Sequence, residues 1–356
     1  MSTPASDTMP VRDQHRFDVA LLQDYLAAHI DGFAGPIEVV QFRGGQSNPT
    51  YGLVASGGRR YVLRRKPPGK LLPSAHAVDR EYRVMTALRD NAVPVAKTWC
   101  LCEDAAVIGS AFYVMDWVPG RILWDPSLPA FTPAQRGALF DEMNRVISAL
   151  HSVDYTAAGL GDYGKPGNYF ARQIDRWTRQ YRASETERIE AMENLLDWLP
   201  QHIPPGDETS IVHGDFRLDN LIFDVDAPRI RAVLDWELST LGHPLADFAY
   251  HCMTWHIPPG VFRGLAGLDL SALGIPSEQA YVAAYCARTR RAAIDQDHWD
   301  FYIAYNLFRL AGILQGIMGR VKAGTAASQQ ALEMGRAARP LAELGWREVE
   351  KILARR

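Results

Sequence analysis

Apolar and polar residues alternate along much of the first third of the chain, and turn residues separate the alternating runs. This pattern is typical of half-buried strands, whose successive side chains point to opposite faces. A helical pattern occurs before them at residues 17–30, where Asp18 stands in the capping position, and again at residues 77–89. The alternating pattern predicts strands at residues 37–42, 51–56, 60–64, 95–101 and 111–115.

Helical spacing of apolar residues dominates the chain after about residue 117. Thr132 and Pro133 form a typical helix start, and we expect their helix to end near His151. Further helices are predicted at residues 168–182 and 185–199, and from Ser277, Trp299 and Ala326 onward.

The change in pattern predicts a domain organisation. Residues 1–15 are expected to form a disordered tail. Residues 16–116 would form an N-terminal lobe with a mainly antiparallel sheet, and residues 117–356 a larger helical C-terminal lobe. The predicted fold class is therefore α+β.

Composition narrows the possible functions. A chain of 356 residues is long enough for two lobes, and 47% hydrophobic with 22% charged residues is ordinary for a globular protein. A net charge of −3 gives no reason to expect nucleic-acid binding. We expect no membrane segment, because no apolar run approaches about 18 residues. The four cysteines lack zinc-like pairing, which favours reduced thiols and a cytoplasmic location; the oligomeric state cannot be predicted.

The stretch from residue 211 to residue 250 carries the candidate chemistry. His213-Gly214-Asp215 is followed by Asn220, and two short strand-like runs joined by a turn then lead to Asp235. Phosphoryl transfer needs a carboxylate near the attacking hydroxyl and oxygen ligands for Mg²⁺. Asp215 is therefore the candidate for the hydroxyl, and Asn220 and Asp235 are the candidates for the metal. The alternative interpretation is a β-hairpin with ordinary turn acids.

This stretch resembles a known family. H-G-D-x-x-x-x-N followed by L-D-W-E is similar to the aminoglycoside phosphotransferase and choline kinase group of small-molecule kinases. A subgroup whose members are also fused ahead of acyl-CoA dehydrogenase domains is more similar still, in GGQSNPTY, YVLRRKPPGKLLPSAHAVDREYRV and HGDFRLDNLIFD. The resemblance covers most of the chain from about Phe42. It implies a bilobal protein-kinase-like fold, ATP and Mg²⁺ as cofactors, and a small-molecule hydroxyl acceptor, such as a hydroxyacyl-CoA.

The glycine-rich turn after the first predicted strand is the candidate phosphate loop. Backbone N–H groups at Gly44 and Gly45 can approach phosphates without a Cβ clash. Ser47 and Asn48 are the candidate side-chain donors. The turn does not match G-x-G-x-x-G, and a plain hairpin is the alternative interpretation.

Arg64 stands where the kinase pattern places its phosphate-binding lysine, as in choline kinases. Glu81, in the first turns of the following helix, is expected to pair with it. Arg65 and Lys66 are neighbours, so the position of the cation is open by one residue. A solvated basic strand end and a surface glutamate are the alternatives.

The segment from Met115 to Gly120 breaks the last predicted strand, where a kinase-like chain crosses between its lobes. The resemblance implies that Met115, Asp116 and Val118 belong to the nucleotide-binding site, with backbone atoms of Asp116 and Val118 contacting the adenine edge. Exposed backbone N–H and C=O groups of this kind can pair with a base.

Four further residues have assigned or open roles. The resemblance implies that Asp247 braces the catalytic loop, and His213 is expected to anchor the loop instead of shuttling protons. Arg217 is equally well interpreted as a γ-phosphate contact or as a surface cation. Glu237 either positions its loop, which we favour, or contacts a second metal through water.

Three other functions compete with an ATP-dependent small-molecule kinase. A catalytically silent, kinase-like binding module would not consume ATP, and the presence of Asp215, Asn220 and Asp235 argues against it. An acyl-CoA dehydrogenase would need a flavin-binding domain, and the chain has none of that family's motifs. Aminoglycoside resistance usually needs an acid-rich pocket, and residues 159–208 are not rich in acids.

Overall fold

The computed structural model describes residues 8–43, 48–67, 76–324 and 329–356, and the side chains of Gln329 and Gln330 are not described. The chain divides into two units. The sheet unit comprises Met1–Leu123, Thr156–Tyr163 and Asp219–Ser239, and the helical unit comprises Trp124–Tyr155, Gly164–Leu218 and Thr240–Arg356. Both units are therefore assembled from separate stretches of the chain, which differs from the predicted boundary at residue 116.

The sheet unit is built on a six-stranded antiparallel sheet in the order β1-β2-β3-β4-β6-β5. Strand β4 lies between β3 and β6, and the register pairs Tyr51 with Leu63 and Leu63 with Val114. The strands are β1 (Thr8–Met9), β2 (Ile37–Phe42), β3 (Thr50–Ala55), β4 (Arg60–Arg65), β5 (Thr98–Cys102) and β6 (Phe112–Asp116).

One face of this sheet packs against helix α1 (Val19–His29). Leu22 and Leu26 of the helix are buried against Tyr51 and Tyr61, and apolar burial of this kind is the main favourable term in folding. Asp18 caps the helix as predicted, because its carboxylate accepts from the backbone N–H groups of the first turn. A short helix, α3 (Ala105–Ile108), follows β5.

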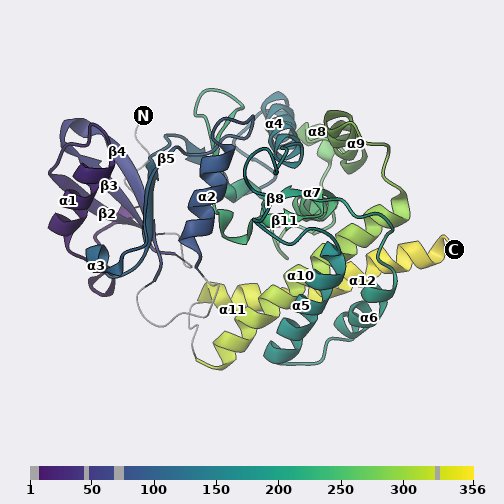
Figure 1. The fold of residues 1–356 in the computed structure, drawn as a ribbon. Coiled ribbons are helices and arrows are strands. Elements are labelled where there is room, and N and C mark those ends of the chain that lie inside the picture. The colour runs from purple at the N-terminus through teal and green to yellow at the C-terminus, as the bar shows by residue number, and fades with distance from the viewer. Residues whose placement is uncertain (1–7, 44–47, 68–75, 325–328) are drawn as a thin grey trace. The chain divides into compact units, whose positions relative to one another are not determined.

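The other side of the sheet faces helix α2 (Val78–Leu88), and Figure 1 shows α1 and α2 on opposite sides of the sheet. The unit also contains a small antiparallel sheet in the order β10-β9-β7. Its strands are β7 (Arg121–Ile122), β9 (Leu221–Phe223) and β10 (Ile230–Val233), so the hairpin predicted after Asn220 is present. The 3-10 helices are η2 (Asp13–His15), η3 (Ser56–Gly58) and η6 (Trp236–Leu238), and η5 (Leu218–Asn220) precedes β9.

The helical unit is organised around the long helix α10 (Gln296–Lys322), which packs against α5, α7 and α12. Helix α4 (Pro133–His151) begins at the predicted position, because Thr132 and Gln135 form a reciprocal capping box. The other helices are α5 (Tyr169–Ser184), α6 (Glu190–Trp198), η4 (Leu199–Gln201), α7 (Pro244–Cys252), η7 (Met253–Trp255), α8 (Leu270–Leu273), α9 (Glu278–Thr289), α11 (Gln329–Arg336) and α12 (Ala338–Ala354). Strands β8 (Ser210–Val212) and β11 (Thr240–Gly242) pair antiparallel.

Two local features differ from the predictions. Residues 8–15, assigned to the tail, contain β1 and η2, and β1 pairs with β2. The helix expected from Ala326 is two helices, with Ala337 between them. The predicted α+β class is confirmed. No helix in the described ranges is both long and apolar enough to cross a membrane.

Candidate active site

In the sheet unit, Arg64 of β4, Glu81 of α2 and Asp235 form a charged cluster, and Glu237 lies beside it. Arg64 Nε is 3.0 Å from Glu81 Oε2, and Arg64 Nη2 is 2.6 Å from Asp235 Oδ1. Glu237 Oε2 lies 3.5 Å from the same Nη2. The Glu81 side chain is only 2% exposed and that of Arg64 only 11%. The predicted pair between Arg64 and Glu81 is therefore present, and Arg64 also contacts Asp235.

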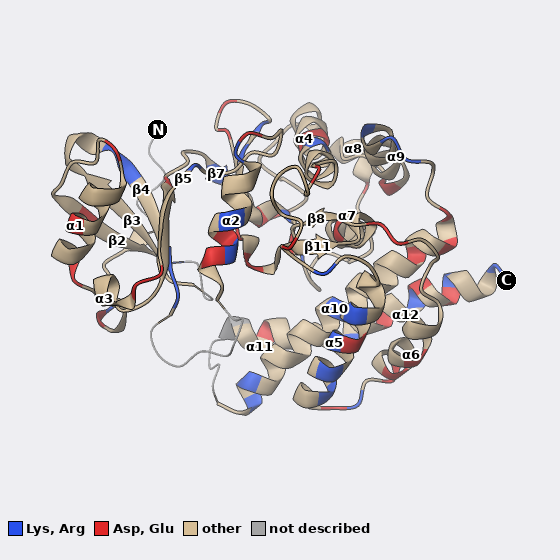
Figure 2. Cartoon of the chain, in the orientation of Figure 1, with Lys and Arg blue, Asp and Glu red and all other residues tan. Residues whose placement is uncertain are grey.

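Burial and the neighbouring charges shift the pKa values of Arg64 and Glu81. Burial alone would lower the pKa of Arg64, but Glu81 and Asp235 outweigh it and raise that pKa above its usual value. Burial raises the pKa of Glu81, and the charge of Arg64 offsets this effect only in part. One guanidinium thus faces the three carboxyl groups of Glu81, Asp235 and Glu237. Figure 2 shows that acidic and basic residues lie together on α2.

The sequence left Arg64, Arg65 and Lys66 as candidates for the phosphate-binding cation, and their contacts in the structure differ. Side chains alternate along β4, so Arg64 faces Glu81 while Arg65 faces the opposite side. Arg65 is 2% exposed, and its guanidinium lies 5.5 Å from the centre of the Phe17 ring. Lys66 Nζ is 3.5 Å from Asp79. Arg64 is the cation that contacts both carboxylates of the cluster.

Asn48 has a different position from the one its predicted role requires. Its side chain is fully buried, and its amide donates to Glu81 Oε1 at 2.9 Å. Its Oδ1 lies 3.0 Å from His76 Nδ1, and the Tyr113 hydroxyl donates to the other Glu81 oxygen at 3.1 Å. The side chain of Asn48 therefore orients Glu81 instead of reaching a phosphate. The predicted phosphate contacts Gly44, Gly45 and Ser47 lie outside the described residues.

The predicted adenine segment begins within β6, which contains Met115 and Asp116. Met115 is buried and pairs with Val62 across the sheet. The Asp116 N–H donates to the Lys97 carbonyl at 2.8 Å, so a base contact at Asp116 would have to use its carbonyl. Val118, two residues on, is half-buried.

The hairpin brings the two predicted metal ligands to neighbouring positions. The Leu234 N–H donates to the Asn220 carbonyl at 2.8 Å. Asp235 directly follows Leu234, so it lies close to Asn220. Asp235 has a left-handed backbone, with φ of 63°, and its side chain is 32% exposed. Arg64 contacts one Asp235 oxygen, which leaves the other available to a metal. Within the described ranges, no group of three or more His, Cys, Asp or Glu side chains is placed to hold a metal ion.

Asp215 lies in the helical unit, after β8. Its Oδ1 accepts from the Tyr250 hydroxyl at 2.5 Å, and its Oδ2 accepts from Arg217 Nε at 3.2 Å. Burial and the charge of Asp215 both raise the pKa of Tyr250, so the phenol remains a donor. The carboxylate of Asp215 is thus held in a defined orientation. Arg217, predicted as either a phosphate contact or a surface cation, pairs with Asp215.

The buried Asp247 of α7 holds the backbone at His213 and Gly214. Its two oxygens accept from the N–H groups of His213 and Gly214 at 2.7 and 2.8 Å, and His151 Nε2 lies 3.1 Å away. Burial opposes ionisation of Asp247, but these hydrogen bonds outweigh burial and lower its pKa. His213 Nδ1 accepts from the Asp215 N–H at 3.1 Å. These contacts are those expected of a brace and an anchor.

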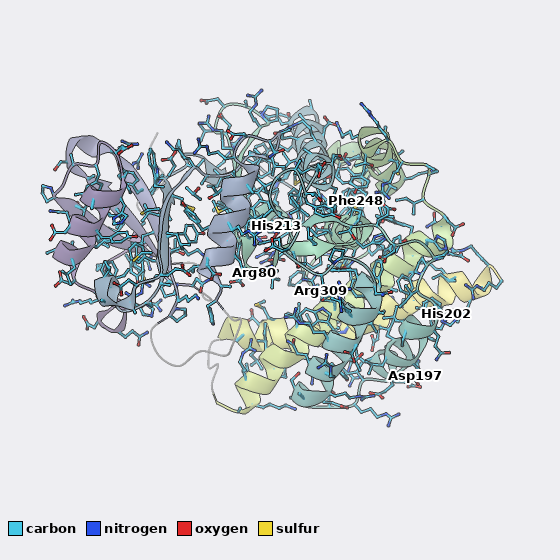
Figure 3. The ribbon with its side chains drawn as sticks, viewed as in Figure 1. Arg80, Asp197, His202, His213, Phe248 and Arg309 are labelled. Carbon is cyan, nitrogen blue, oxygen red and sulfur yellow. The ribbon has the colours of Figure 1, made fainter. Side chains whose placement is uncertain are left out.

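The sequence analysis did not predict the role of two residues that hold this loop. Tyr250 is one, and Arg309 of α10 is the other: its Nη2 donates to the Gly214 carbonyl at 2.6 Å. The guanidinium lies 4.9 Å from the centre of the Tyr250 ring and 5.5 Å from that of Trp177. No described carboxylate forms an ion pair with Arg309, which Figure 3 labels together with His213. Neither residue belongs to a short motif, so only the tertiary structure reveals them.

The two-unit fold is one that phosphotransferases share. The chain belongs to the phosphotransferase enzyme family, whose family description matches residues 38–300. The predicted resemblance to aminoglycoside phosphotransferases and their acyl-CoA dehydrogenase-fused relatives is thereby confirmed.

Particular relatives define the similarity further. The chain is 46% identical over 347 residues to mouse (Mus musculus) acyl-CoA dehydrogenase family member 10. The aligned region covers 96% of this chain and 32% of the mouse protein. The chain thus spans about a third of the length of this relative. It is 60% identical to a Ralstonia eutropha JMP134 protein provisionally described as an aminoglycoside phosphotransferase, with a TM-score of 0.87 and coverage of 94% and 99%.

More distant structures share the fold. A choline kinase from Cryptosporidium parvum Iowa II has a TM-score of 0.66 at 12% identity, covering 95% of this chain and 97% of its own. Aminoglycoside phosphotransferase APH(4)-Ia, in a ternary complex with AMP-PNP and hygromycin B, has a TM-score of 0.59 at 16% identity, covering 92% and 98%. Both confirm the predicted kinase-like fold.

Proposed function

We propose that the chain is an ATP- and Mg²⁺-dependent phosphotransferase that moves the γ-phosphoryl group to a hydroxyl of a small molecule. The observation that carries this proposal is the cluster of Arg64 and Asp235 with the buried Glu81. In kinases, a cation paired with a helix carboxylate holds the nucleotide phosphates, and a nearby aspartate holds the metal. The fold neighbour solved with AMP-PNP supports ATP as the donor.

In this proposal, each residue of the sheet unit has one task. Arg64 holds the phosphates, and Glu81 fixes the direction of its guanidinium. Asp235 and Asn220 would bind Mg²⁺, which would neutralise phosphate charge. Backbone atoms of Asp116 and Val118 would hold the adenine, so that most of the rate enhancement comes from positioning and charge neutralisation.

Asp215 would orient or deprotonate the acceptor hydroxyl. The Tyr250 hydroxyl and Arg217 hold its carboxylate, and Asp247 holds the backbone on which it stands. A base held in one direction can accept a proton along a single line, which favours a bound hydroxyl over bulk water. The main role of Arg217 in this account is to orient Asp215.

The surroundings of Asp215 disfavour a polycationic acceptor. Arg217 contacts its carboxylate, and Arg309, which has no ion-pair partner among described residues, binds the preceding carbonyl. Two guanidinium groups so close to the base would repel an aminoglycoside or choline. A neutral or anionic hydroxylated acceptor fits better. The name of the mouse relative favours a hydroxyacyl-CoA, although this chain spans only 32% of that protein.

The test is ATP consumption across a panel of acceptors. The panel contains hydroxyacyl-CoAs, hydroxy acids, amino alcohols, sugars and aminoglycosides, each assayed with and without Mg²⁺. Asp215→Asn is the matched control, because it keeps the shape of the side chain but removes the base. The proposal expects Mg²⁺-dependent transfer to at least one neutral or anionic acceptor in the wild-type protein, and loss of that transfer in the variant.

Two results would contradict the proposal. Failure of the wild-type protein to bind ATP at any Mg²⁺ concentration would indicate a binding module of another kind. Efficient transfer to aminoglycosides alone would contradict the acceptor class while preserving the reaction.

A further inference from the structure

We propose that Arg80 and Arg83 lock α2 in place, so that the Arg64 cluster is assembled without an activating partner. This inference rests on the proposed function and concerns its regulation. In protein kinases, the pair between the phosphate-binding cation and the helix glutamate forms only when that helix is correctly positioned. The contacts of α2 in this protein fix that position through two arginines that flank Glu81.

Arg80 connects α2 to two other segments of the sheet unit. Its Nη2 donates to the Tyr163 carbonyl at 2.6 Å and lies 3.4 Å from the Ser239 carbonyl. Its guanidinium lies 4.2 Å from the centre of the Tyr163 ring, and the Tyr163 hydroxyl donates back to the Arg80 carbonyl at 3.3 Å. Tyr163 is fully buried. Arg80, labelled in Figure 3, is therefore held by a ring and by two backbone oxygens.

Arg83 makes a second connection one turn further along α2. It donates to the Gly159 carbonyl at 2.9 Å and pairs with Asp162 through both of its terminal nitrogens. This pair is exposed, so its direct effect on stability is small. Its effect is geometric, because it ties the same helix to the same segment as Arg80 does.

These connections join the helix to the segment that carries Asp235. Ser239 lies four residues after Asp235, and the intervening η6 packs against α2. One arginine thus spans α2, which carries Glu81, and the end of the turn that follows Asp235. Movement of α2 away from Arg64 would break the contacts of Arg80 at the same time.

The hydrogen-bond acceptors of Arg80 offer no means of switching the contact off. Arg80 binds backbone carbonyls, which carry no ionisable or modifiable group. A charge-assisted hydrogen bond of this type is roughly twice as strong as a neutral one. We infer that Arg80 is a positioning residue whose loss frees α2 and weakens the hold of Glu81 on Arg64.

The experiment compares three variants of α2. Arg80→Met removes the donors but keeps the stem, Arg80→Lys keeps a charge, and Arg89→Ala is the control at the exposed C-cap of the helix. MgATP binding is measured by calorimetry, and hydrogen exchange is measured over residues 78–88. We expect Arg80→Met to weaken MgATP binding by about ten- to a hundredfold and to speed exchange in α2. For Arg80→Lys, the MgATP affinity and the exchange rate in α2 should lie between those of Arg80→Met and the wild type. Arg89→Ala should match the wild type in both.

A second set of variants, made in Glu81→Gln, distinguishes a purely structural role of Arg80 from the proposed positioning of Glu81. In Glu81→Gln, the helix position no longer matters to Arg64, so adding Arg80→Met should cause little further loss of MgATP affinity. An equal loss in both backgrounds would overturn the proposal. So would unchanged α2 exchange in Arg80→Met, or, should that variant not fold, in Arg80→Lys. Failure of the wild-type protein to bind MgATP would instead refute the proposed function, and the exchange measurement would still test the lock.

Discussion

Asp247→Asn isolates the brace of the catalytic loop, because the side chain keeps its shape while one acceptor oxygen becomes a donor. In the structure, the buried carboxylate accepts from His213, Gly214 and His151. After the change, one backbone N–H loses its acceptor, at about 1–3 kcal/mol. The other two hydrogen bonds change from charge-assisted to neutral, at roughly 1 kcal/mol each. The expected loss in unfolding free energy is about 3–5 kcal/mol.

The assay is thermal and urea unfolding near neutral pH. Because the entropy of unfolding grows with chain length, the thermal midpoint of a 356-residue chain shifts by only about 1.3 °C per kcal/mol, so it should fall by roughly 4–7 °C. Asp141→Asn is the control, because its pair with Arg288 at 2.6 Å involves a 65% exposed carboxylate and should contribute at most about 1 kcal/mol. Similar losses in both variants, or a loss below about 1 kcal/mol at Asp247, would refute the reasoning.

The brace also has a pH signature. The folded-state pKa of Asp247 is lowered, so its contribution is present above the unfolded value of about 3.9 and is lost as pH falls through the folded value. The difference in stability between wild type and Asp247→Asn should therefore shrink only in strongly acidic solution. A difference that shrinks between about pH 6 and pH 8 would point to another group.

Three further predictions concern single residues or pairs. Asp215→Asn should lower kcat by several orders of magnitude while MgATP still binds, and turnover within about tenfold of wild type would contradict its role. Arg64→Ala and Glu81→Ala should be non-additive in MgATP binding, with a coupling above the roughly 0.2–1 kcal/mol of an exposed pair. Burial opposes protonation of His256, but Glu278 and Glu348 outweigh it and raise its pKa to about 9. Its contribution, about 3 kcal/mol, should be complete below about pH 6.5 and lost as pH rises through 9, relative to His256→Gln in urea unfolding.

Local signals in the sequence were sufficient for much of the fold. Asp18 and Thr132 were recognised as helix caps, because a cap is decided by residues within one turn. The hairpin after Asn220 was recognised for the same reason, since its turn residues are consecutive. The pairing of Arg64 with Glu81 followed from the family resemblance.

Long-range contacts were not predictable in the same way. Arg309 lies 95 residues from Gly214 in the chain, and Tyr250 lies 35 residues from Asp215. No periodicity or spacing connects such residues, because their contact depends on how α7 and α10 pack. Asn48 was assigned to the phosphates from its place in a glycine-rich turn, but its burial is decided by Glu81, 33 residues later.

The boundary between units was missed because both units are discontinuous. Residues 156–163 and 219–239 lie within the stretch that was expected to form the helical lobe, yet they belong to the sheet unit. A shift in composition along the chain can locate a boundary only when each unit is one segment. The break at Ala337 was missed because apolar spacing continues on both sides of it.

The central claim, that the charged cluster binds a nucleotide and its metal, is tested most directly by calorimetric titration of ATP with and without Mg²⁺. Wild type, Asp235→Ala and Asn220→Ala are compared at one ionic strength. The account predicts Mg²⁺-dependent ATP binding in the wild type, and a larger loss for Asp235→Ala, because a carboxylate supplies charge where an amide supplies only a dipole. Equal ATP affinity in all three proteins, with no effect of Mg²⁺, would contradict it.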